Sequence, residues 1–160
     1  MKEEVRIKLR SVRYEVEASM FSDENDEKLS VSAVEEDNEP EKIEINTLGS
    51  LKRENGRVEI SYEETQATGM EGSSTAVSYL TDEPGVVSMI REGVVSTALV
   101  FEAGKRHHCV YQTPFMPFEV CVYTKKVENR LADEGYLELD YMIEIRGARA
   151  ERTQFRMELL

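Results

Sequence analysis

The sequence has little of what marks several large classes of protein. Its 160 residues include only two cysteines, too few for the disulfide framework of a small secreted domain, and no CxxC or HExxH spacing that would indicate a metal site. The sequence contains no run of about 18 apolar residues, so we expect no transmembrane helix. The N-terminal residues are charged from the start and lack the apolar segment of a signal peptide. We therefore predict a cytoplasmic protein without a metal or other cofactor.

Positive charge is also scarce, because 20 Lys and Arg residues stand against 32 Asp and Glu and give a net charge of −12. Nucleic-acid affinity comes mostly from Lys and Arg that neutralise phosphates, so we expect no nucleic-acid partner, and no anionic membrane surface either. More than half of this excess of negative charge lies between Ser22 and Pro40, a segment with eight carboxylates and one lysine. We interpret this segment, at about 19–40, as an inserted hairpin or loop; a partner-binding or cation-attracting arm is the alternative.

Alternation of apolar and polar residues dominates the rest of the chain and is typical of half-buried β-strands. About ten such segments follow one another through short Gly-, Pro- or Asn-containing connections, and none has sustained helical periodicity. Strands joined in this way pair with their sequence neighbours, and a twisted meander leaves open edges unless it closes. We therefore predict a single all-β domain over residues 1–160, an antiparallel meander closed into a barrel of about eight to ten strands. A β-sandwich is the alternative.

Two local patterns refine this prediction. Asn55-Gly56 combines two residues that tolerate positive φ, which predicts a type I′ turn between strands at 51–54 and 57–63. Near the N-terminus the apolar phase changes at Ser11: Val5, Ile7 and Leu9 precede it, and Val12, Tyr14 and Val16 follow in the other register. A one-residue slip of this kind predicts a β-bulge that bends a long first strand.

Several motifs occur together: Arg91-Glu-Gly93, Tyr111-Gln-Thr113-Pro114-Phe115, the strand ending in Thr124, and Gly135-x-Leu137-x-Leu139-x-Tyr141. With these motifs the chain from about Ile43 to the C-terminus resembles the YwiB-like family of calycin-type barrels, a family of unknown function, and Val5–Val16 matches the family's first strand. The resemblance implies a lipocalin-like barrel and no catalytic residues. Met116-Pro117 stands where the family tends to have a glycine, and the acidic segment is longer than the family's usual first connection.

The segment 107–124 has the pattern of a hairpin with its tip centred on Phe115. In that register Cys109 faces Cys121, close enough for a disulfide, although a cytoplasmic protein would keep both as thiols. His107 and the neighbouring basic residues would lower a thiol pKa only weakly, so redox sensing has little support.

The same register places His108 and Gln112 on the hairpin's more apolar face, together with Val110, Phe118, Val120 and Val122. We predict that this face lines the barrel interior. His108 and Gln112 are then either buried polar groups satisfied by a neighbour or water, or residues that orient a ligand. The opposite, outer face would carry Tyr111, Cys121, Tyr123 and Val127, an incompletely polar surface that favours self-association or a partner.

Arg91 precedes a second predicted turn, Glu92-Gly93, on the face opposite Ile90, Leu99 and Phe101. If that face points inward, Arg91 is a buried cation that needs a carboxylate or an anionic ligand. Composition favours the other orientation, an exposed arginine.

The sequence supports one function slightly more than others, the binding of a small, partly apolar molecule inside the barrel. The candidate ligand-binding residues are Arg91, His108, Gln112 and Tyr62. The alternative is a protein-interaction module or homodimer with a filled core. An enzyme has the least support, because no nucleophile, acid–base pair or phosphate-binding loop has the required spacing.

Overall fold

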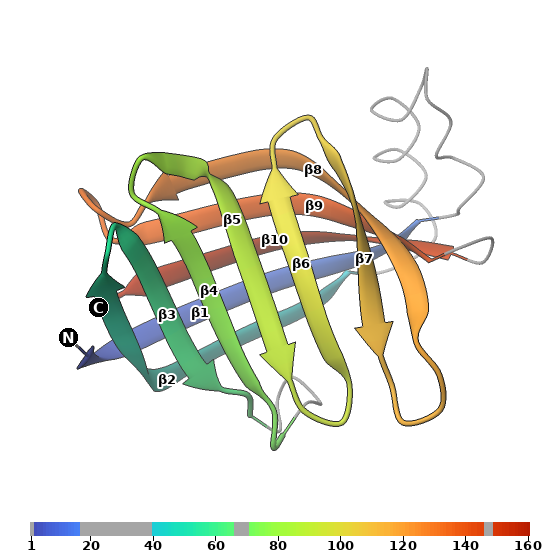
Figure 1. Cartoon of the computed structure of the whole chain (residues 1–160), viewed down its shortest axis with the longest axis horizontal. Coiled ribbons are helices and arrows are strands. Elements are labelled where there is room, and N and C mark those ends of the chain that lie inside the picture. The colour runs from blue at the N-terminus through green and yellow to red at the C-terminus, as the bar shows by residue number, and fades with distance from the viewer. Residues whose placement is uncertain (1, 17–39, 66–70, 146–148) are drawn as a thin grey trace.

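The computed structural model is a closed antiparallel barrel (Figure 1). It describes residues 2–16, 40–65, 71–145 and 149–160. Within these ranges the strands are β1 (Lys2–Val16), β2 (Glu41–Glu54), β3 (Arg57–Glu63), β4 (Ser74–Leu80), β5 (Glu83–Glu92), β6 (Ser96–Glu102), β7 (Arg106–Gln112), β8 (Phe118–Arg130), β9 (Tyr136–Ile145) and β10 (Arg149–Leu159). Each strand pairs with its sequence neighbours, and β1 pairs with both β2 and β10, so the predicted closed meander is confirmed. The acidic insertion predicted at about 19–40 lies outside the described residues, apart from Pro40.

The turn between β2 and β3 is the one that the sequence predicts. Asn55 and Gly56 have φ angles of 53° and 74°, and the flanking residues Glu54 and Arg57 are paired. Positive φ at both central positions matches the right-handed twist of the two strands.

The β-bulge predicted at Ser11 is wrong. β1 keeps one register with β2 and one with β10 through this position. The phase change has another cause, because the inward positions of β1 change from apolar to polar. Ile7 and Leu9 belong to the core, and Ser11 and Arg13 follow them along the wall of a cavity that Leu9 also lines. Val12 and Tyr14, which follow Ser11, therefore lie on the outer face.

The barrel is filled with side chains at the end where both chain termini lie. The inward positions here are large and apolar, and each is at most 5% exposed: Ile7, Leu51, Val58, Ile60, Val77, Val87, Phe101, Leu137 and Met157. We call the opposite end, which carries the β3–β4, β5–β6 and β7–β8 connections, the mouth. Apolar side chains thus fill one end of the barrel, and a ligand-binding site can lie only at the mouth.

The β7–β8 hairpin differs by one residue from the predicted register. His108 pairs with Cys121, Cys109 with Val120 and Tyr111 with Phe118. Six residues lie between the last paired residues, Tyr111 and Phe118. Within them the Thr113 hydroxyl donates to the Met116 carbonyl at 2.7 Å and accepts from its amide at 3.1 Å. A slip of one residue exchanges the two faces of a strand.

Candidate ligand-binding cavity

A cavity of about 490 Å³ occupies the mouth half of the barrel. It reaches the surface at the β5–β6 connection, where Val94 lines it and is 77% exposed. Its volume lies within the range of about 300–1,000 Å³ that is usual for small-molecule sites. Apolar side chains from five strands form much of the wall: Leu9, Ile43, Ile45, Met89, Leu99 and Phe155.

A row of polar residues crosses the cavity wall from β3 to β7. The strand registers pair Tyr62 with Thr75, Thr75 with Arg91, Arg91 with Thr97, and Thr97 with Tyr111. All five residues lie at one level of the barrel, and all except Thr75 line the cavity. We call these five residues the polar row.

Arg91 is held in the polar row by two neighbours. Its Nη2 lies 3.4 Å from Oε2 of Glu64, and its Nε donates to the Thr75 hydroxyl at 3.2 Å. Thr75 donates in turn to the same Glu64 oxygen at 2.5 Å. The Glu64 side chain is 2% exposed and that of Arg91 is 20% exposed. Arg91 therefore has the inward orientation, with a carboxylate partner.

Glu64 is a site residue that sequence reasoning missed. The signal was present, since Glu64 has the same parity as Val58, Ile60 and Tyr62. Gly93 lies in the predicted Glu92-Gly93 turn and has a further role that the sequence did not show. A Cβ at this position would lie 2.1 Å from Oγ of Ser73, so only glycine lets the β5–β6 turn approach this part of the mouth.

Three tyrosines face the cavity, Tyr62, Tyr111 and Tyr141. Burial raises the pKa of each, to about 12 for Tyr111. All three are therefore neutral at physiological pH, with hydroxyl groups that can donate a hydrogen bond. Tyr62 has the inward position expected from its alternation with Val58 and Ile60. Tyr111 was predicted on the outer face and is inside as a result of the hairpin register.

The predicted inward orientation of His108 and Gln112 is wrong. Both residues are exposed, and neither lines the cavity. The one-residue shift turns them outward and brings Cys109 and Tyr111 inward. Cys109 is buried and Cys121 partly buried, and both are free thiols. Val127, another predicted outer residue, packs against the core because the register of β8 shifts between Thr124 and Lys126.

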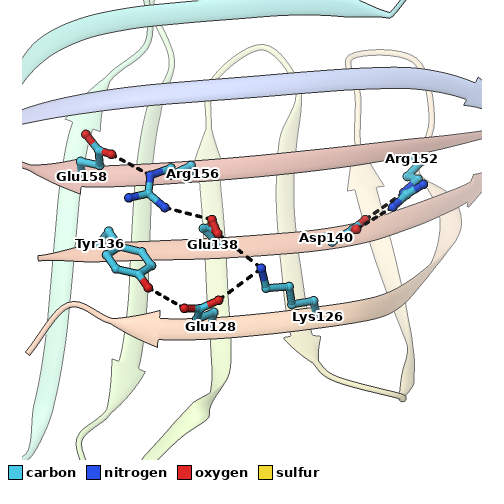
Figure 2. A network of polar contacts seen from close by, with 8 residues as sticks. All are labelled: Lys126, Glu128, Tyr136, Glu138, Asp140, Arg152, Arg156 and Glu158. Atoms are coloured by element: carbon cyan, nitrogen blue, oxygen red, sulfur yellow. Dashed lines mark hydrogen bonds and ion pairs between the residues drawn. The ribbon is translucent and has the colours of Figure 1, made fainter. Parts of the chain in front are cut away.

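A second polar cluster lies on the outer face of β8, β9 and β10 (Figure 2). Glu128 and Glu138 are direct register partners, and Lys126 lies 3.2 Å and 3.4 Å from their carboxylates. Other pairs continue the cluster: Tyr136 with Glu128, Arg156 with Glu138 and Glu158, and Arg152 with Asp140. Since each of these charges contacts an opposite charge, we interpret the cluster as cross-strand stabilisation.

Other kinds of site have no support among the described residues. No group of three or more His, Cys, Asp or Glu side chains there is arranged to hold a metal ion. Nor does that part of the chain contain a helix long and apolar enough to cross a membrane.

Comparison with known proteins identifies relatives without adding an activity. The model of a family described as a domain of unknown function, DUF1934, matches residues 29–157. The crystal structure of the ywiB protein from Bacillus subtilis is similar, with a TM-score of 0.63 at 20% sequence identity, over 98% of this chain and 93% of that chain. At this identity the likeness shows a shared fold. No curated protein matches the sequence.

Proposed function

This chain belongs to the DUF1934 family, whose description assigns no function, and from the chemistry of its interior we propose that the barrel binds a small, partly apolar molecule in its mouth. The proposal includes the calycin-type mode of binding and the cytoplasmic location expected from the sequence. Tyr62 and Arg91 remain candidate ligand contacts, whereas His108 and Gln112 no longer do, because they lie outside the cavity.

The observation that carries the proposal is the exposure of Arg91 to a cavity with a largely apolar wall. A guanidinium placed only to stabilise the fold would have its donors satisfied by protein groups. Arg91 uses one donor on Thr75 and one on Glu64, which leaves three of its five N–H groups without an acceptor among the described residues. A pocket that combines an apolar wall with a few convergent polar groups is typical of a ligand site.

Self-association through the mouth is the second candidate, because the two neighbouring tips carry exposed apolar residues. Phe115 is 94% exposed, Met116 66% and Val94 77%. A homodimer formed here would cover the cavity entrance. The alternative with a filled core has less support, since the mouth half of the interior is hollow.

The test combines native mass spectrometry with a fluorescent reporter. Protein purified gently from its own host should retain a small molecule, and the same spectrum reports the oligomeric state. Since the chain has no tryptophan, Phe155→Trp places a single reporter in the cavity wall, and Phe115→Trp places a matched one on the exposed tip. Adding the extracted molecule should change the emission of the first variant and leave the second unchanged. A protein that carries no molecule, with neither reporter responding to extracts, would contradict the proposal.

A further inference from the structure

The hydrogen-bonding groups of the polar row are mostly unused donors. Besides the three N–H groups of Arg91, the Tyr111 hydroxyl has no hydrogen-bond partner among the described residues. The Thr97 hydroxyl, opposite Arg91 on β6, is buried and likewise lacks a partner in the described chain. An unsatisfied buried hydroxyl is costly, so a group that accepts its hydrogen bond has a specific advantage. The polar row therefore favours a ligand that carries a hydrogen-bond acceptor.

The charge of Arg91 is already balanced, which separates this site from a typical anion site. Glu64 neutralises it at 3.4 Å from inside the wall. The remaining charged residues of the lining are Arg13, Glu71 and Glu151, so the whole lining has one more carboxylate than guanidinium groups. The three tyrosines are neutral. A second carboxylate placed on Arg91 would be repelled by Glu64, and an ammonium group would meet the guanidinium and a row of donors.

From this balance we infer that the ligand presents an uncharged oxygen acceptor, a carbonyl of the amide, ester or ketone type, to Arg91, Thr97 and Tyr111. This inference rests on the proposed function and gives the chemical class of the ligand. The rest of the molecule is apolar, because Leu9, Ile45, Met89 and Leu99 line the same cavity. Arg91 and the hydroxyl groups fix the carbonyl, and the apolar wall holds the remainder.

The test uses three probes with the same eight-carbon chain and different head groups, octanamide, octanoate and octylamine, at pH 7. Each is titrated into the Phe155→Trp protein, with Phe115→Trp as the control for binding elsewhere. We expect octanamide to bind at least tenfold more tightly than octanoate and octylamine, because only the amide offers an acceptor without a charge.

Variants of the polar row then test which groups select the amide. Thr97→Val and Tyr111→Phe each remove one hydrogen-bond donor with little change of shape. Each should weaken the binding of octanamide several-fold and have little effect on the binding of octylamine. Arg91→Met should weaken the binding of octanamide most, and the double variant Arg91→Met/Glu64→Gln gives the same test without a buried unpaired carboxylate, should the single variant fold poorly. Ala98→Ser, on the outer face of β6, should bind as the unchanged protein does.

The possible outcomes separate this inference from the proposed function. If octanoate or octylamine binds as tightly as octanamide, the acceptor inference is wrong and the binding function stands. If the three row variants bind octanamide as the parent protein does, the row does not recognise the head group. If no probe binds and the protein from its own host carries no molecule, the proposed function itself fails.

Discussion

The energetic coupling of Arg91 and Glu64 gives the most direct test of how the cavity wall is built. Arg91→Met keeps most of the side-chain length and removes the charge, so the 2%-exposed Glu64 carboxylate loses the cation 3.4 Å away. Removing one partner of a buried ion pair costs about 3–5 kcal/mol, because a buried charge is left uncompensated. Since the Arg91 side chain is 20% exposed, we expect the lower end of this range, about 3 kcal/mol.

The converse variant and the double variant complete the cycle. Glu64→Gln removes charge-assisted hydrogen bonds, which are worth about 1.5–3 kcal/mol each, and should cost about 2 kcal/mol. The double variant leaves neither charge unpaired. It should therefore lose about 2–3 kcal/mol in place of the sum of about 5 kcal/mol, which corresponds to a coupling of about 2–3 kcal/mol.

Urea unfolding followed by far-ultraviolet circular dichroism measures these changes. A loss of about 3 kcal/mol should lower the melting temperature of a domain of this size by about 6–12 °C. The matched control is Arg53→Met, which breaks an exposed pair with Glu3 and should change stability by less than about 1 kcal/mol. Single-variant losses that add to within about 0.5 kcal/mol in the double variant would refute the coupling.

Three further predictions concern the mouth, the outer cluster and the thiols. Gly93→Ala should destabilise the protein by about 1–3 kcal/mol in urea unfolding, since its Cβ would lie 2.1 Å from Oγ of Ser73, just before β4; an unchanged midpoint would show that the turn relaxes freely. The hydrogen bond from Tyr136 lowers the pKa of Glu128, so its contribution to stability is present above the unfolded value of about 4.3 and lost as the pH falls through the folded value. The stability difference between the parent protein and Glu128→Gln should therefore shrink on acidification, and a difference that grows would contradict this assignment. Burial raises the pKa of Cys109 and Cys121, so both should react slowly with a thiol reagent at pH 7, Cys121 first; one fast thiol or a disulfide in the folded protein would be the contrary result.

The features that could be predicted from the sequence are those that local chemistry determines. Asn55-Gly56 forms its turn because both residues tolerate positive φ wherever they occur. Alternation determines the strands, and short connections determine which strands are neighbours. Closure of the meander follows from these two properties and the cost of open edges. None of this requires knowledge of a contact between distant residues.

The register of β7 and β8 could not be predicted in this way, because it goes with contacts outside the two strands. The Thr113 hydroxyl bonds to Met116 within the connection, and Gln112 pairs with Ser96 of β6. Both faces of the hairpin have some apolar character, so a comparison of their hydrophobicity does not show which face points into the barrel. The resulting error placed two of the four candidate site residues, His108 and Gln112, in the interior, whereas both lie outside the cavity.

The interior of the barrel also left a signal in the sequence that is visible only when strands are compared. Along β1 the inward positions change from Leu9 to Ser11. Along β3 they change from Ile60 to Tyr62, and Glu64 follows directly after the strand. On β5 the change is from Met89 to Arg91. A single polar inward residue is usually a satisfied core group, but polar inward residues on several strands around one cavity require many partners at once. A filled core offers few such partners, whereas a cavity open to water or a ligand supplies them. The coincidence of these changes across the meander, more than any single residue, therefore indicates a hollow mouth.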